Sequence, residues 1–218
     1  MCSYNLTQWI FNIQSKLADS VIEEDGFLNM ERVAGADVSF SVNEKAFAAA
    51  VVLDLENLKV LEKKILEVEL FFPYMPGFLG IRESDAVVSS VNLLNTDYEV
   101  LIVNGHGILH PRSFGLASQV GVLLDVPTIG VAKRLIGGRY INQGTQLEHL
   151  NEAVQFIKND NRIVGAFFRG NYVSVGHKIS LKTALNIMKK TSIYKMPEPL
   201  RQAHILATKM FKRELNGN

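Results

Sequence analysis

The stretch RVAGADVSFSVNEKAFAAAVVLDLENLKVLEKKILEVELFF, residues 32–72, determines the predicted fold. It contains three runs that are rich in apolar and β-branched residues, at 32–40, 46–55 and 58–72. A short Glu-Asn connection joins the last two runs, and such short connections are typical of hairpins. We therefore predict an antiparallel meander of three strands.

The residues after the meander predict a parallel pair of strands. The apolar runs 99–103 and 127–132 indicate buried strands, and residues 113–124 between them have the pattern of a helix. A strand, a helix and a second strand in this order favour a parallel βαβ unit. The fold class is therefore α/β, with a mixed sheet flanked by helices.

Other elements follow from periodicity. The remaining predictions are helices at 7–22, from Ser84 onward, at 180–190 and at 198–213, and a hairpin at 162–175 that turns at Gly170-Asn171. In the first helix the predicted buried face consists of four apolar residues at helical spacing, Trp9, Ile13, Leu17 and Val21. Residues 139–160 are polar and weakly patterned, so no element is predicted there.

Size and composition predict one domain spanning residues 1–218, with a monomer as the expected state. The lone cysteine, Cys2, cannot form an internal disulfide, which favours a reducing compartment. We expect a cytoplasmic protein with no membrane partner, because neither a signal peptide nor a membrane-spanning run is evident.

Charge is unevenly distributed along the chain. Residues 176–218 hold nine Lys or Arg and two Glu, a balance of +7, whereas the preceding residues balance at −6. This segment is either a phosphate-contacting surface or an ordinary solvated helix face.

Three polar residues at predicted strand or helix ends are candidate metal ligands. Asp37 lies within an apolar strand, Glu83 lies near a predicted helix start, and Asn104 follows the run EVLIV. Carboxylates from separate elements are the usual ligands of Mg²⁺. Each residue also has a plainer interpretation: a solvent-facing edge aspartate, a helix-capping acid and a turn asparagine.

Two loops are candidate substrate contacts. The string FPYMPGFL at 72–79 has two prolines, which stiffen an apolar loop that could enter a nucleic-acid stack or pack under the core. In NGHGILHPR, residues 104–112, the glycines allow close backbone approach, and His110 and Arg112 are candidate phosphate contacts. Lys133 ends the strand PTIGVAK, where its charge could neutralise a phosphate under attack.

Four motifs in this order and spacing resemble the endonuclease V family. They are VAGADVSF, FPYMPGFLGIRE, GHGILHPRSFGLAS and GVLLDVPTIGVAK, and RQAH at 201–204 is similar to a further family motif. The resemblance covers about residues 5–213. It implies a ribonuclease-H-like mixed sheet and a DNA-repair activity, hydrolysis of the second phosphodiester bond 3′ to a deaminated base, chiefly hypoxanthine. The implied cofactor is Mg²⁺, with Mn²⁺ as a substitute, and the implied partner is inosine-containing DNA, with single-stranded RNA as a further possibility.

The resemblance also implies roles for individual residues. Asp37, Glu83 and Asn104 match the metal ligands, and Lys133 and His204 match further catalytic positions. The residues that match the substrate-contacting positions of the family are Pro73, Tyr74, Met75, Pro76, Gly77, Leu79, Gly105, Gly107, His110 and Arg112. Within this set the Pro-Tyr-Met-Pro segment matches the strand-parting wedge, and the glycines and Leu79 match the base pocket.

Two departures from the family pattern affect the expected activity. Asn104 stands where the family has aspartate, and Gln119 stands where it has histidine. An asparagine offers one neutral carbonyl oxygen in place of a charged carboxylate, so cation binding and cleavage are expected to weaken. A non-cleaving inosine-binding protein is therefore one alternative. A nuclease that acts on flaps or mismatches, also with a ribonuclease-H-like sheet, is a second alternative.

Overall fold

The computed structural model describes residues 2–40, 45–141, 145–147 and 152–215, and these form five helices and ten strands. The helices are α1 (Cys2–Ala18), α2 (Leu79–Val91), α3 (Leu116–Leu124), α4 (Leu181–Thr191) and α5 (Glu198–Leu215). The strands are β1 (Arg32–Phe40), β2 (Lys45–Asp54), β3 (Val60–Glu69), β4 (Val100–Asn104), β5 (Thr128–Ala132), β6 (Arg139–Tyr140), β7 (Thr145–Leu147), β8 (Glu152–Asn159), β9 (Arg162–Phe168) and β10 (Asn171–His177).

The strands form one mixed sheet in the order β3-β2-β1-β4-β5-β10-β9-β8-β6, with β7 paired to β8. The first three strands make the predicted antiparallel meander, and β1, β4 and β5 run parallel to one another. The predicted βαβ unit is also confirmed, because α3 connects β4 to β5.

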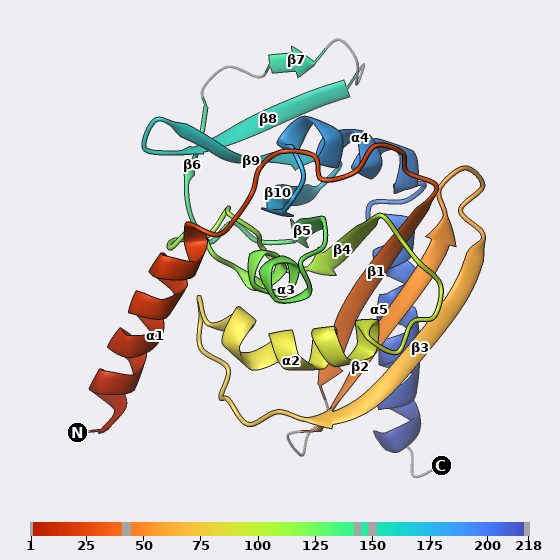
Figure 1. The fold of residues 1–218 in the computed structure, drawn as a ribbon, viewed down its shortest axis with the longest axis horizontal. Helices are drawn as coiled ribbons and strands as arrows, with labels where there is room; N and C mark the ends of the chain where they lie inside the picture. The colour runs from red at the N-terminus through yellow and green to blue at the C-terminus, as the bar shows by residue number, and fades with distance from the viewer. Residues whose placement is uncertain (1, 41–44, 142–144, 148–151, 216–218) are drawn as a thin grey trace.

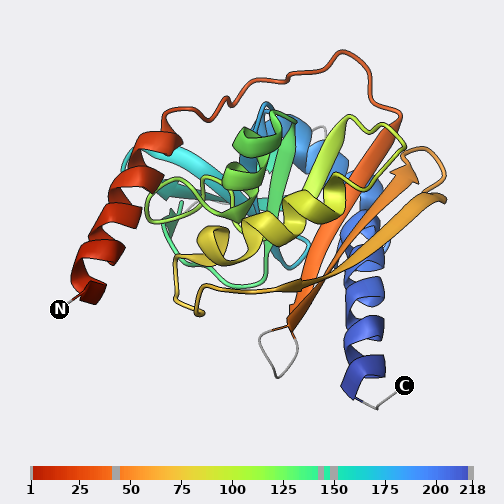
Figure 2. The ribbon, with the colours of Figure 1, turned by 60° about the horizontal axis from the view of Figure 1, so that its bottom comes forward.

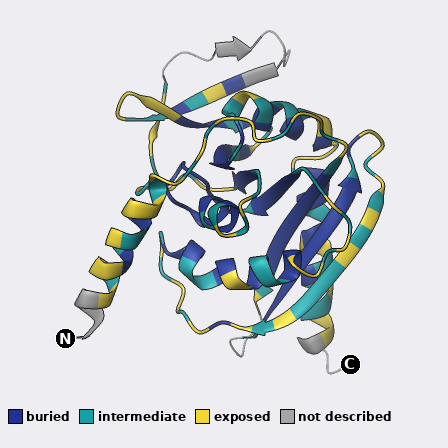
Figure 3. Ribbon diagram, in the orientation of Figure 1, coloured by how far each residue is buried: buried dark blue, intermediate teal, exposed yellow. Residues whose placement is uncertain are grey.

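Helices cover both faces of the sheet, with α2 and α3 on one face and α4 and α5 on the other (Figures 1 and 2). Alternate residues of the central strands supply the two hydrophobic cores. In β4, for example, Ile102 packs towards α5, while Leu101 and Val103 pack towards α2 and α3. The central strands are therefore buried on both sides, whereas the edge strand β3 is only partly covered (Figure 3).

Close packing of α5 on β1 requires a glycine at position 35. A Cβ there would lie 2.3 Å from the carbonyl carbon of Pro199 and 2.6 Å from the backbone nitrogen of Leu200. The same face of β1 carries Asp37 and Ser39, and the Ser39 hydroxyl lies 3.2 Å from that of Thr208 on α5. These contacts fix the position of α5 along β1.

We expect Gly35→Ala to destabilise the protein by about 2 kcal/mol, because the added methyl group must push the first turn of α5 away from the sheet. The free energy of unfolding in urea measures the effect. Gly26→Ala is the matched control, since a Cβ at Gly26 would first meet the side chain of Lys178, at 3.1 Å. Equal losses in the two variants would contradict the packing explanation.

Three details of the sequence-based prediction are wrong. Among the described side chains of α1, those of Ile10 and Gln14 are buried, whereas Trp9 and Leu17 of the predicted face are 61% and 37% exposed, and the helix ends at Ala18, before Val21. Residues 139–160 do contain strands, because β8 and its short partners extend the sheet beyond β9. The helix predicted from Ser84 begins earlier, at Leu79.

Ser84 does not cap α2, because it lies inside the helix, which begins at Leu79. Its hydroxyl accepts a hydrogen bond from Nε2 of Gln119 on α3, at 2.9 Å. None of the helices in the described part of the chain is long and apolar enough to cross a membrane.

Candidate active site

Asp37 is the centre of a polar cluster at the C-terminal ends of β1 and β4. Its side chain is 4% exposed. One carboxylate oxygen accepts a hydrogen bond from Nδ2 of Asn104, at 2.7 Å, and the other accepts one from Nδ1 of His204, at 2.7 Å. The strand register explains the contact between Asp37 and Asn104. Ala36 pairs with Val103, so Asp37 and Asn104, the next residues of the two parallel strands, lie side by side. α5 brings His204 over the same point.

Glu83 lies on α2, which packs on the opposite face of the sheet from α5. It is the fifth residue of α2 and is 5% exposed. Burial, followed by the negative charge of Asp37, raises the pKa of Glu83 to about 8, although the neighbouring Arg82 acts in the opposite direction. Both carboxyl groups are buried and their charges interact, so ionisation of both is costly. In turn, the hydrogen bond to Asp37 raises the pKa of His204 above its ordinary value.

The donor set fits a hard divalent cation. Mg²⁺ is commonly held by one or two carboxylates together with water and substrate phosphate, and a cation would relieve the repulsion between Asp37 and Glu83. Within the described part of the chain, no three His, Cys, Asp or Glu side chains are arranged to hold a metal ion. Asn104 occupies the third position and turns its amide N–H towards Asp37, so it adds no charge.

The raised pKa of Glu83 has a measurable consequence for stability. Between about pH 4.5 and about pH 8 the folded protein keeps a proton that the unfolded chain has lost. Raising the pH through this range therefore favours unfolding, by up to about 1.4 kcal/mol per pH unit. In chelator-containing buffer we expect the free energy of unfolding of the protein to fall across this range.

Glu83→Gln should remove that pH dependence, whereas Glu56→Gln, at an exposed glutamate in the β2–β3 turn, should keep it. Denaturant titrations at several pH values provide the measurement. An unchanged slope in Glu83→Gln would mean that another group carries the proton.

Lys133 directly follows β5, the strand that pairs with β4. Val131 is in register with Asn104, so Lys133 is two residues further towards the same edge of the sheet. Its ammonium group donates a hydrogen bond to Oδ1 of Asn171, at 2.6 Å. Burial and the nearby charge of Lys195 lower its pKa. Asn171 was missed by the sequence-based reasoning, because its position after Gly170 suggested a turn residue.

The loop at 72–78 is held at both ends by hydrogen bonds, and the side chain of Tyr74 between them is exposed to solvent. The carbonyl oxygen of Phe72 accepts a hydrogen bond from Arg82, and that of Gly77 accepts one from Arg112. The Phe78 ring packs edge-on against Phe11 of α1, at 5.3 Å between centroids. Tyr74 is 69% exposed. The loop therefore presents a rigidly anchored aromatic side chain.

His110 and Arg112 act as anchors of this loop. Nε2 of His110 donates to the carbonyl oxygen of Gly77, at 3.1 Å, and Arg112 also donates to Gln14 of α1, at 2.7 Å. Burial, with a smaller effect of Arg112, lowers the pKa of His110 to about 4, so this ring is neutral near pH 7. These contacts favour positioning of the loop over a direct electrostatic contact with phosphate.

Gly105 and Gly107 sit where the backbone has no room for a side chain. A Cβ at Gly107 would lie 1.9 Å from the carbonyl oxygen of Val175, and one at Gly105 would lie 3.0 Å from Leu116. The Gly107 N–H donates to the hydroxyl of Ser174, at 2.9 Å. The close approaches made by these glycines are therefore to β10 and α3.

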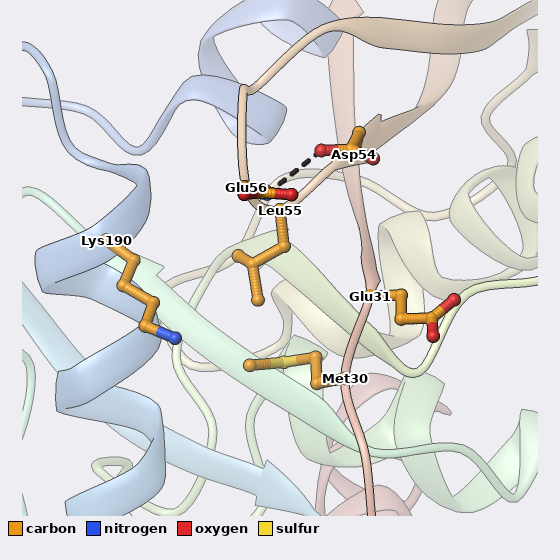
Figure 4. Close-up of a pocket in the computed structure, with 6 residues that line it drawn as sticks. All are labelled: Met30, Glu31, Asp54, Leu55, Glu56 and Lys190. Carbon is orange, nitrogen blue, oxygen red and sulfur yellow. Dashed lines mark hydrogen bonds between the residues drawn. The ribbon is translucent and has the colours of Figure 1, made fainter.

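A separate cavity of about 580 Å³ borders the N-terminal end of β1 and the C-terminal end of β2 (Figure 4). Its lining consists of Met30, Glu31, Asp54, Leu55, Glu56 and Lys190. No residue of the Asp37 cluster lines it, so this cavity is distinct from the candidate active site.

Comparisons with known proteins identify the family. A sequence profile described as Endonuclease V matches residues 15–205. Endonuclease V of Dictyoglomus thermophilum is 40% identical over 212 residues, covering 94% of this chain and 91% of that protein. The catalytic domain of human endonuclease V superposes with a TM-score of 0.86 at 31% identity, covering 98% of each chain.

A further solved structure is that of Ciona intestinalis endonuclease V in complex with a 24mer DNA containing an inosine followed by a ribo-adenosine. It has a TM-score of 0.79 and 28% identity, and it covers 97% of this chain and 99% of that chain. The predicted ribonuclease-H-like fold is confirmed by these neighbours. The chain therefore belongs to the endonuclease V family.

Proposed function

We propose that this protein is an endonuclease that recognises hypoxanthine in DNA or single-stranded RNA and hydrolyses the second phosphodiester bond on its 3′ side. The observation that carries this proposal is the buried carboxylate of Asp37, which is hydrogen-bonded to Asn104 and His204 and whose charge acts on the buried Glu83. Two buried carboxyl groups whose charges repel each other cost stability until a cation neutralises them, so a cation-binding role accounts for them.

In the proposed mechanism Asp37 and Glu83 would hold Mg²⁺, or Mn²⁺ in its place, together with the carbonyl oxygen of Asn104. When bound, the cation would supply Lewis-acid stabilisation of phosphate charge and would lower the pKa of water. His204 orients the Asp37 carboxylate through its Nδ1–H, and the Lys133 ammonium group stabilises the extra negative charge of the phosphate under attack. Water adds to phosphorus and the P–O3′ bond breaks, which yields a 3′ hydroxyl and a 5′ phosphate.

Base recognition is assigned to the two anchored loops. Tyr74 and the flanking Pro73, Met75 and Pro76 part the strand, since this segment is stiff and exposes its aromatic ring. Backbone groups near Gly77, Leu79, Gly105 and Gly107 then read the edge of the displaced base. The complex formed by the Ciona relative with inosine-containing DNA supports this assignment. We expect a monomer to suffice, because every named residue comes from one chain.

The test is nicking of a labelled strand with a single inosine, with Mg²⁺ or Mn²⁺, against the same strand with adenosine. A product one nucleotide beyond the inosine, found only in the inosine strand, supports the proposal. Equal cutting of the two strands would instead identify a nuclease that reads nucleic-acid structure, and DNA and RNA versions of the strand establish the sugar preference.

One observation favours a second candidate, a non-cleaving inosine-binding protein. The Asn104 amide donates a hydrogen bond to Asp37 at 2.7 Å, so part of the negative charge that would attract a cation is already compensated. Tight binding of the inosine strand without any nicking at high Mn²⁺ concentration would favour this candidate.

A further inference from the structure

Asn171 combines complete burial with hydrogen bonds on both sides of its amide. The side chain belongs to the first residue of β10 and is 0% exposed. Its Oδ1 accepts from the Lys133 ammonium group at 2.6 Å, and its Nδ2 donates to the carbonyl oxygens of Arg169, at 3.1 Å, and of Lys195. The hydrogen bonds of this amide are therefore made to two backbone carbonyl groups and to Lys133, and they fix the orientation of the Asn171 side chain.

The strand register explains why these two residues meet. Tyr172 of β10 pairs with Ala132 of β5 in an antiparallel ladder, so Asn171 and Lys133 are the next residues of the two strands. The preceding turn is tight, since Arg169 and Gly170 have φ angles of 49° and 77°. The turn delivers Asn171 into the interior beside the lysine.

The chemistry of the contact differs from that of an ion pair. Asn171 is neutral, so it directs one of the three ammonium N–H groups of Lys133 without cancelling the positive charge. Lys133 itself is exposed, which leaves its remaining N–H groups within reach of a bound strand. A carboxylate in the place of Asn171 would hold the lysine equally well but would neutralise it.

We propose that Asn171 is the positioning residue that orients Lys133 towards the scissile phosphate while leaving its charge intact. This inference rests on the proposed function for its catalytic consequence. The same amide joins Lys133 to the backbone of the exposed segment at Lys195.

The test is a double-mutant cycle on the full chain, with single-turnover nicking of the inosine strand as the readout. We expect Asn171→Ala to lower the rate about tenfold, with strand affinity changed by less than about twofold. In a Lys133→Ala background the same substitution should have no further effect, because Asn171 acts through the lysine. Equal losses in both backgrounds would overturn the proposal.

Asn171→Asp separates position from charge. It keeps the acceptor for Lys133 but replaces the N–H that donates to the carbonyl oxygens of Arg169 and Lys195 with an oxygen. We expect a loss at least as large as that of Asn171→Ala, because the new carboxylate pairs with the ammonium group and is itself less well held. A full rate in Asn171→Asp would overturn the proposal. Thermal unfolding of each variant establishes that it is folded, and Asn171→Ser is the replacement if the alanine variant is not.

A second readout needs no nuclease activity. Limited acetylation followed by mass spectrometry compares the labelling of Lys133 with that of Lys16, an exposed lysine on α1. We expect Asn171→Ala to increase the relative labelling of Lys133 about threefold, since the amine loses its fixed partner. Unchanged labelling would overturn the positioning role. If inosine strands are never cut, the proposed function fails, but the labelling result still tests the role of Asn171.

Discussion

Asn104→Asp is expected to raise the rate of nicking beside inosine by roughly 10²- to 10³-fold, which corresponds to a few kcal/mol of transition-state stabilisation. The substitution exchanges a neutral amide that donates a hydrogen bond to Asp37 for a carboxylate beside that of Asp37. The affinity of the protein for the cation should rise together with the nicking rate. Single-turnover rates across a range of Mg²⁺ concentrations measure both effects.

The matched control is Asn57→Asp, which makes the same change of charge in the β2–β3 turn and keeps the oxygen that accepts from the backbone of Lys59. This control should leave the rate unchanged. Without cation, Asn104→Asp should also be less stable than the parent protein, because two carboxylates then face each other directly. A variant that gains neither rate nor cation affinity would contradict the assignment of residue 104 to the metal site.

Asp37→Ala is expected to reduce nicking to background, a loss of at least about 10³-fold when measured in the Asn104→Asp variant. Asp37 is the side chain that joins Asn104 and His204, and its charge acts on Glu83. Its removal therefore dismantles the cluster. Affinity for the inosine strand in chelator should change by less than about threefold, because the anchored loops are not part of this network.

Asp125→Ala is the control for this loss. Like Asp37, Asp125 contacts a histidine, His177, and it also pairs with Lys178, but it lies after α3 and its side chain is 75% exposed. Its removal should leave the nicking rate intact. A substantial residual rate in Asp37→Ala would show that the hydrolysis takes place elsewhere on the molecule.

The central part of the fold could be predicted from the sequence because its strands are buried on both sides. The runs at 32–40 and 99–103 consist mostly of small, apolar or β-branched residues, so their pattern depends little on the surrounding structure. α1 could not be predicted as well. The helix touches the body through Ile10, Gln14 and Phe11, and the choice of that face depends on Arg112 and Phe78, which are distant in sequence.

The candidate site was predictable only in part, for a similar reason. Asp37 and Asn104 are recognisable because a polar residue interrupts or ends an apolar run. Asn171 carries no such signal, since an asparagine after glycine is common in turns. Only the pairing of β5 with β10 brings it to Lys133. Likewise, the anchoring of the 72–78 loop by Arg112 depends on tertiary contacts that no local pattern encodes.

The most direct test of a shared cation site is the anomalous difference density of crystals soaked in Mn²⁺. We expect a single strong peak within coordination distance of the carboxylates of Asp37 and Glu83, about 2.0–2.3 Å from their oxygens. The absence of a peak at these side chains, or a peak confined to the cavity lined by Glu31, Asp54 and Glu56, would contradict the proposed active site.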